Sequence, residues 1–133
     1  TMAEVALASA LVDSKKLTLL HCVSCYPCPP ENANLPRIED LQELSKSVGY
    51  SDHVLGIHAA MASLDYDVVV IEKHFTTDKS LPGRDNAYAI TPDEMSELSE
   101  YINVYNKVKA YHGADYQEIE REAREVYSGR WGA

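Results

Sequence analysis

The sequence has no long apolar run and no cluster of basic residues. None of its apolar stretches approaches the roughly 20 residues that a membrane-spanning helix needs. Lysine and arginine together number 12, against 21 aspartates and glutamates, so the formal net charge is −9. An acidic chain of this kind is a poor partner for nucleic acid or for an anionic membrane. The net negative charge of the chain would repel a phosphorylated ligand, so such a ligand would have to be held by the local arrangement of its binding residues.

The cysteines lack the fourth member that a metal or cluster site would need. Cys22, Cys25 and Cys28 follow a C-x2-C-x2-C spacing, which leaves a four-cysteine cluster or a structural zinc site one ligand short. An odd number at tight spacing also argues against a disulfide framework. We therefore expect reduced cysteines in a cytoplasmic protein. A cysteine-based metal or cluster protein is the weaker alternative, and visible absorbance of the purified chain would favour it.

The first residues lack the basic segment of a secretory signal peptide. Thr1 precedes Met2, so we expect these 133 residues to have been cut from a longer chain. The composition is 45% hydrophobic and 25% charged, which is typical of globular domains.

Apolar runs alternate with helical patterns along the chain. The apolar runs 17–24 and 67–76 are predicted strands, and residues 48–52 are an expected short strand between them. Helices are predicted at 4–11, 36–48, 54–64, from Thr91 to Val108, and at 116–127. Strands that alternate with helices indicate βα units with a parallel sheet. About three such units are far fewer than a closed (β/α)8 barrel contains. We expect a fragment, or a chain that pairs with another to complete its sheet.

Reactive side chains gather at the predicted strand ends, where parallel α/β folds collect their functional residues. In the third strand, alternation of side chains places Val68, Val70, Glu72 and His74 on one face and Val69, Ile71 and Lys73 on the other. Polar residues at the end of an apolar strand favour a site over a solvated loop edge.

Two histidines occupy matching positions at the ends of neighbouring strands. His53 and His74 are separated by one helix and one strand, so we expect them to be neighbours at one rim of the sheet. Two neutral imidazoles are good ligands for a divalent transition metal. The spacing therefore predicts a metal site. His21 either lines this site or is a core histidine, whereas His58 is expected to be a packed or surface residue.

Two further residues have both a functional and a structural interpretation. Ser51 is either a hydroxyl donor to a phosphate or carboxylate or a helix N-cap. Asp85 lies in the irregular loop after the third strand, where it either binds sugar hydroxyls or occupies a turn.

Three segments together resemble one enzyme family. They are LLHCVSCYPCPPENANL, VGYSDHVLGI and VVVIEKHFTTDKSLPGRDNAYAITPDEM. Each is similar to a segment of the sialic acid synthases, a family that includes legionaminate and pseudaminate synthases. The resemblance covers roughly residues 17–100, in the same order and spacing.

The resemblance implies the C-terminal portion of a (β/α)8 TIM barrel over residues 1–133. It implies binding of phosphoenolpyruvate, an N-acetylmannosamine-type sugar and a divalent ion, with Mn²⁺ expected and Mg²⁺ or Co²⁺ as alternatives. The family's metal ligands fall on His53 and His74, and its phosphoenolpyruvate contact falls on Ser51. Ser24 and Tyr26 match positions that contact sugar and phosphoenolpyruvate, although asparagine is common where Ser24 stands. Asp85 matches a sugar-binding carboxylate, and Glu72 matches an acidic residue that could assist proton transfer.

Two parts of the family pattern are not found in these 133 residues. One is the family's N-terminal strands, with lysines and a glutamate that hold substrate, and the other is the antifreeze-like domain. We therefore expect little or no activity from the isolated chain, and association into a homo-oligomer or with a complementary half of the barrel. The alternative from another functional class is a non-catalytic half-barrel that serves binding or assembly.

Overall fold

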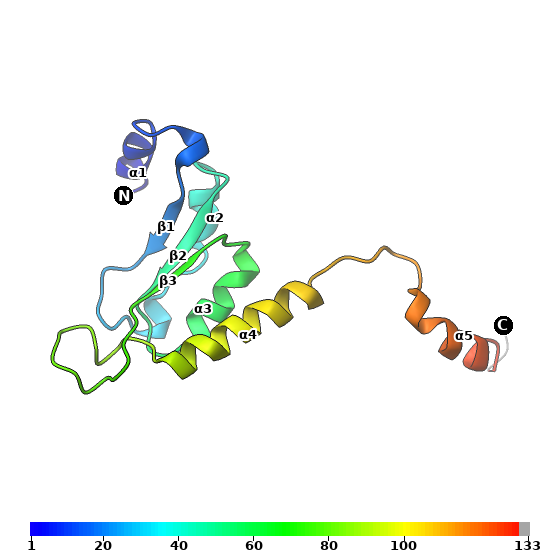
Figure 1. The fold of residues 1–133 in the computed structure, drawn as a ribbon. Helices are drawn as coiled ribbons and strands as arrows, with labels where there is room; N and C mark the ends of the chain where they lie inside the picture. The colour runs from blue at the N-terminus through cyan, green and yellow to red at the C-terminus, as the bar shows by residue number, and fades with distance from the viewer. Residues whose placement is uncertain (131–133) are drawn as a thin grey trace. The chain divides into compact units, whose positions relative to one another are not determined.

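The structure, a computed structural model, describes residues 1–130 (Figure 1). The chain divides into two compact units. The first, Thr1–Asn103, contains the sheet and all the predicted site residues. The second begins at Val104, and within its described residues it contains the end of one helix and two short helical segments.

The first unit is built on a parallel sheet of three strands in the order β1-β2-β3 (Figure 1). The strands are β1 (Leu19–Cys22), β2 (Val48–Asp52) and β3 (Ile71–Lys73). Cys22 is paired with Ser51, and Ser51 with Glu72, so the carboxyl ends of the strands lie at the same edge. The parallel βα arrangement predicted from the sequence is confirmed.

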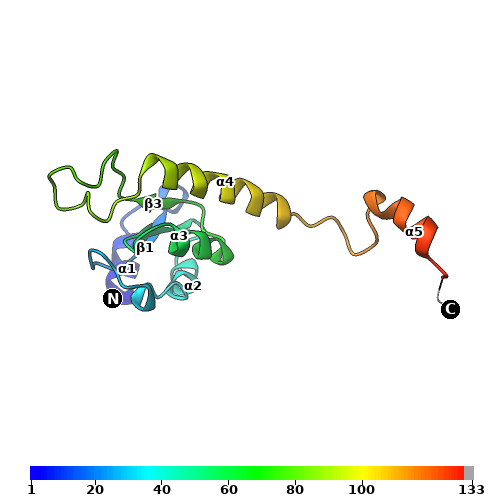
Figure 2. The same ribbon diagram turned by 90° about the horizontal axis from the view of Figure 1, so that it is seen from below.

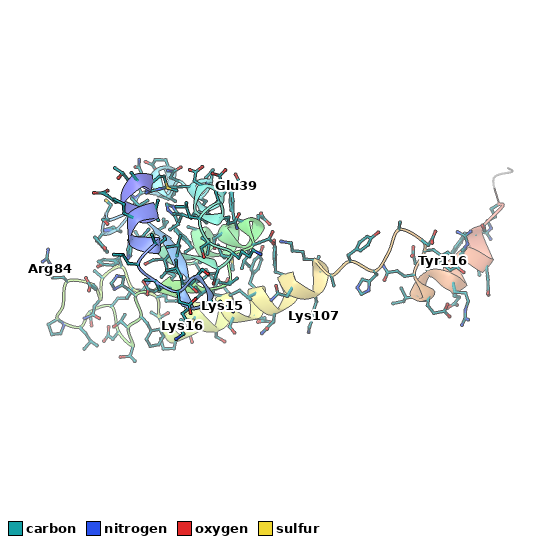
Figure 3. The ribbon with its side chains drawn as sticks, turned by 90° about the horizontal axis from the view of Figure 1, so that it is seen from above. Lys15, Lys16, Glu39, Arg84, Lys107 and Tyr116 are labelled. Atoms are coloured by element: carbon teal, nitrogen blue, oxygen red, sulfur yellow. The ribbon has the colours of Figure 1, made fainter. Side chains whose placement is uncertain are left out.

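The remaining elements are short except for one helix. The α-helices are α1 (Met2–Ser9), α2 (Arg37–Gln42), α3 (His58–Ser63), α4 (Pro92–Val108) and α5 (Arg121–Tyr127). The 3-10 helices are η1 (Ser14–Lys16), η2 (Pro30–Asn32), η3 (Leu64–Tyr66) and η4 (Glu118–Glu120). Figure 3 marks Lys15 and Lys16 in η1, just before β1.

One face of the sheet is covered by α2 and α3, which pack beside the strands (Figure 2). Val48 and Tyr50 of β2 form a buried cluster with Ile38 and Leu41 of α2. Successive side chains of a strand point to opposite faces of the sheet, so the position of Val48 and Tyr50 fixes the orientation of the other residues of β2. The covered face therefore takes Val48, Tyr50 and Asp52, and the opposite face takes Gly49 and Ser51.

The opposite face is more open to solvent. Leu20 and Val70 remain 37% and 42% exposed, although they flank Gly49 closely. A Cβ on Gly49 would lie 2.4 Å from Val70 Cγ1 and 2.6 Å from Leu20 Cδ2. The close approach of these neighbours requires glycine in the middle strand. On this open face, the side chains around Gly49 are apolar and closely spaced. The side chains at the carboxyl ends of the strands are polar.

His21 belongs to the covered face and is a core histidine. It is 1% exposed and its ring stacks on Tyr50 at 5.6 Å between centroids. Its Nε2–H donates to the carbonyl of Ala33 at 2.8 Å, while Nδ1 has no hydrogen-bond partner among the described residues. Burial lowers the pKa of His21 below its usual value. Of the two interpretations of this residue, the structural one holds.

Most predicted bounds differ from those in the structure. The strand expected over 17–24 is the shorter β1, and the helices expected over 54–64 and 116–127 begin only at His58 and Arg121. Two larger differences have an identifiable local cause. The helix expected over residues 36–48 ends at Gln42, because the backbone turns at Ser45 and Val48 joins β2. The strand expected over 67–76 is reduced to β3, although Tyr50 N–H still donates to the carbonyl of Val70. Val68 lies before this pairing and packs against the helix-side core, so the predicted alternation does not extend to it.

The start of α4 matches the sequence signal. Thr91 N–H donates to Glu94 Oε2 at 2.9 Å, and Glu94 N–H donates back to Thr91 Oγ1 at 3.4 Å. This reciprocal pair is a capping box, which Thr91 and Glu94 indicate in the sequence by their spacing of three residues. In the described part of the chain, none of the helices has both the length and the apolar content needed to cross a membrane.

Candidate functional site

The register of β2 and β3 places two polar pairs side by side at the carboxyl edge of the sheet. Ser51 is paired with Glu72, and its hydroxyl donates to Glu72 Oε1 at 2.7 Å. Asp52 is paired with Lys73, whose Nζ donates to Asp52 Oδ2 at 2.8 Å. The first pair lies on the open face and the second on the covered face. The residue that follows each strand is a histidine.

His53 and His74 come together as the sequence predicts. Their ring centroids are 5.3 Å apart, and His53 is 7% exposed. His53 Nδ1 lies 3.0 Å from the carbonyl oxygen of Val23, so Nδ1 carries the proton and donates. Nε2 of His53 is therefore left with its lone pair. Cys22 Sγ also lies 3.7 Å from Nδ1.

Aromatic rings enclose the two histidines. Tyr26 lies against His53 with ring centroids 4.2 Å apart, and Tyr88 meets His74 edge-on at 5.2 Å. Tyr26 lies in the loop that follows β1, which contains three prolines in four positions. The peptide bond between Tyr26 and Pro27 is cis. The prolines exclude regular structure here, and the irregular loop places the ring of Tyr26 against His53 and His74, which follow β2 and β3.

A carboxylate from the loop after β3 reaches His74. Asp85 Oδ2 is 3.7 Å from His74 Nδ1. The hydroxyl of Tyr88 donates to the other oxygen, Asp85 Oδ1. This hydrogen bond to a carboxylate, followed by burial, raises the pKa of Tyr88 to about 12. Figure 3 marks Arg84 on the same loop.

A buried ion pair supports the site from the covered face. The side chains of Lys73 and Asp52 are 3% and 0% exposed. Lys73 Nζ also donates to the carbonyl of Val54 at 2.8 Å, and Asp52 Oδ1 accepts from Val54 N–H at 2.9 Å and from Tyr50 Oη–H at 3.0 Å. Burial, followed by the nearby Asp52 carboxylate, raises the pKa of Tyr50 above its usual value. The pair thereby fixes the backbone on both sides of His53.

Two hollows share His74. One, of about 250 Å³, is lined by Ser51, His53, Glu72, Lys73 and His74. The other, of about 490 Å³, is lined by Tyr26, His74, Arg84, Asp85 and Tyr88. The structure therefore brings together six of the seven predicted site residues. Ser24 is exposed and lines neither hollow.

The donor set fits a divalent ion with two protein ligands. One nitrogen of each ring can reach a common point at this separation, because metal–nitrogen bonds are about 2.0–2.1 Å long. Within residues 1–130, no group of three or more His, Cys, Asp or Glu side chains is arranged to hold a metal. An ion held by His53 and His74 would therefore complete its coordination with water or substrate oxygens.

Sequence reasoning missed four residues of the site: Asp52, Lys73, Arg84 and Tyr88. Asp52 and Lys73 are adjacent to the two histidines, and alternation already put Lys73 on the face opposite Glu72. Their pairing could not be seen without the register of the strands. Tyr88 lies in an irregular loop, where no periodic pattern indicates that its ring would return to His74.

Comparison with known proteins identifies the family of the chain. The model of the NeuB family matches residues 1–113. The chain belongs to the NeuB family. The N,N'-diacetyllegionaminic acid synthase of Campylobacter jejuni is 40% identical over 94 residues, which are 70% of this chain and 28% of that enzyme. Its counterpart in Legionella pneumophila is 46% identical over 90 residues, 67% of this chain and 25% of that enzyme.

A solved structure shares the fold. The N-acetylneuraminic acid synthetase of Leptospira borgpetersenii, in complex with citrate, matches with a TM-score of 0.79 and 32% identity, over 95% of this chain and 45% of that chain. The three parallel strands with their helices therefore form part of a βα barrel. The chain spans only about a quarter of the length of these two curated relatives.

Replacement of Lys73 by methionine tests the support that the ion pair gives to the site. Lys73→Met leaves the Asp52 carboxylate buried without its cation, so we expect the free energy of unfolding to fall by about 3–5 kcal/mol. The matched control is Lys79→Met, which breaks the more exposed pair with Glu94 and is expected to cost at most about 1 kcal/mol. Urea unfolding followed by circular dichroism measures both. Equal losses in the two variants would contradict the structural role given to Lys73.

Proposed function

We propose that this chain provides the metal-binding and part of the substrate-binding machinery of a nonulosonic acid synthase. In the proposed reaction, phosphoenolpyruvate condenses with N-acetylmannosamine or a related amino sugar, and phosphate is released. The observation that carries the proposal is the pair His53 and His74, held at adjoining strand ends beside Ser51 and Glu72. Membership of the NeuB family supports the reaction class.

A divalent ion, expected to be Mn²⁺, would act as a Lewis acid on the aldehyde oxygen of the open-chain sugar when bound. His53 and His74 would hold it through Nε2. For His53 this nitrogen is left free because Nδ1 donates to the carbonyl of Val23. A hydrogen bond at the second ring nitrogen also orients a ligating imidazole.

The proposed chemistry forms one carbon–carbon bond and one carbon–oxygen bond, the latter from water, and breaks the carbon–oxygen bond to phosphate. Carbon 3 of phosphoenolpyruvate bonds to the aldehyde carbon, and the aldehyde oxygen takes up a proton. Water adds to the cation at carbon 2, and the tetrahedral intermediate expels inorganic phosphate to leave the ketone. Glu72 is exposed enough to meet water, and it accepts the hydroxyl hydrogen of Ser51. We assign it the proton transfer from the attacking water.

The remaining predicted residues have roles that follow their positions. Ser51 would turn its hydroxyl from Glu72 to phosphoenolpyruvate. Tyr26 and Asp85 border the larger hollow, which suits a sugar with one apolar face and several hydroxyls. Ser24 lies outside both hollows, so its proposed contact requires substrate that reaches beyond them. The residues that bind the phosphate group would come from the strands that complete the barrel. We propose that the reaction takes place in the cytoplasm, with phosphoenolpyruvate as the donor of the three-carbon unit.

The second candidate is a non-catalytic half-barrel that binds or assembles with another polypeptide. It is favoured by the two outer strands, β1 and β3, each of which has one neighbour in the sheet. Leu20 and Val70 on the open face are also partly exposed. Such edges favour association, with a second copy of the chain or with a complementary half of the barrel.

Metal titration separates the two candidates. We expect the full chain to bind Mn²⁺ or Co²⁺, and His53→Ala and His74→Ala each to weaken binding by at least about tenfold, because each removes one of two protein ligands. His58→Ala is the matched control, since His58 lines a different hollow, on the helix side of the sheet. Isothermal titration measures the affinities. Equal affinities in all four proteins would favour the scaffold.

A chimeric enzyme tests the reaction itself. The matched 94-residue segment of the C. jejuni synthase is replaced by the corresponding segment of this chain, and phosphate release is followed with phosphoenolpyruvate, an amino sugar and Mn²⁺. We expect turnover that His53→Ala lowers by more than about 100-fold, since a Lewis acid contributes several kcal/mol. The 133-residue chain alone is expected to show little or no turnover. Unchanged turnover in the His53→Ala chimera would refute the proposal.

A further inference from the structure

The loop after β3 is closed on itself beside His74. Phe75 and Ile90 form an isolated parallel bridge. Thr76 N–H donates to the carbonyl of Ile90 at 2.9 Å, and Ile90 N–H donates to the carbonyl of His74 at 2.8 Å. The returning end of the loop is therefore tied directly to the backbone of His74. Tyr88, two residues before Ile90, is held next to that histidine.

Tyr88 is buried, whereas residues 77–85 of the same loop are exposed. It is 8% exposed, whereas the side chain of Asp85 is 60% exposed. An exposed carboxylate normally samples several rotamers, and fixing it costs side-chain entropy. The hydroxyl of Tyr88, on a buried and rigid ring, holds Asp85 Oδ1 in one place.

The held carboxylate faces one nitrogen of His74. Asp85 Oδ2 lies 3.7 Å from His74 Nδ1, and the Tyr88 ring meets the imidazole at 76°. A carboxylate on this side favours the tautomer that carries its proton on Nδ1. His53 has a closer acceptor at the same ring nitrogen, since its Nδ1–H donates to the carbonyl of Val23 at 3.0 Å. Both rings would then offer Nε2 to a shared ligand.

We propose that Tyr88 is a positioning residue for His74, acting through Asp85. Its hydroxyl fixes the carboxylate, the carboxylate fixes the tautomer and rotation of the imidazole, and the imidazole is thereby prepared to bind a divalent cation. The inference deepens the proposed function, because it gives the metal ligand of that site its orienting partners. It also gives Asp85 a role besides contact with sugar.

The test uses the full chain without metal, labelled with [15N]histidine, at about pH 8.5, well above the ordinary imidazole pKa of about 6.5. Nitrogen chemical shifts and long-range proton–nitrogen couplings report which ring nitrogen of His74 carries the proton. We expect Nδ1–H to predominate, and Tyr88→Phe to raise the Nε2–H population at least twofold. Tyr66→Phe is the matched control, since Tyr66 lines the hollow on the helix side and its loss of a hydroxyl should leave His74 unchanged.

Cobalt affinity gives a second readout on the same proteins. Removal of an orienting partner typically lowers metal affinity by about 10–100-fold. We expect the loss of Co²⁺ affinity caused by Tyr88→Phe to be near the lower end of this range. In an Asp85→Asn background, Tyr88→Phe should have almost no further effect, because the two residues act in one chain of contacts. A purely structural role for the Tyr88 ring predicts instead that the phenylalanine variant, which keeps the ring, behaves like wild type.

The proposal is overturned if His74 carries its proton on Nε2 in the wild type, or if Tyr88→Phe leaves its tautomer unchanged. It is also overturned if the effects of Tyr88→Phe and Asp85→Asn add in full. A tautomer shift in a chain that binds no Co²⁺ would support the positioning role while refuting the proposed metal function, so the two failures are distinguishable.

Discussion

The register between β2 and β3 is the constraint on which the candidate site depends. A shift of one residue would turn every side chain of one strand to the other face. Two pairs oppose such a shift, one on each side of the sheet: Ser51 with Glu72, and the buried Asp52 with Lys73. With this register, the residues that follow the two strands are neighbours. His53 and His74 are neighbours because the residues that precede them, Asp52 and Lys73, are paired across the two strands.

The buried pair also explains how a short sheet holds a defined site. Each strand has only three to five residues, so few ladder hydrogen bonds hold the edge. Asp52 and Lys73 bind both the N–H and the carbonyl of Val54, which fixes the chain on the far side of His53. Loss of either partner would leave an uncompensated buried charge, and the backbone that carries His53 would lose its anchors.

The sequence predicted the arrangement well where a local signal controls it. The start of α4 follows from the capping residues Thr91 and Glu94, and the meeting of His53 with His74 follows from their matched positions at strand ends. The predicted helix over 36–48 was too long because Leu44 and Val48 fit a helical period while Ser45 turns the backbone. Tyr88 was not predicted, since its place depends on how an irregular loop closes through Ile90, and no local pattern encodes that closure.

Pulsed electron paramagnetic resonance of Mn²⁺ bound to the full chain tests the central claim most directly. With [15N]histidine, the nitrogens coupled to the ion can be counted in the wild type and in His53→Ala. The account predicts two directly bound imidazole nitrogens in the wild type and one in the variant. A single bound imidazole in the wild type, or a pair that survives His53→Ala, would contradict a site built from the ends of β2 and β3.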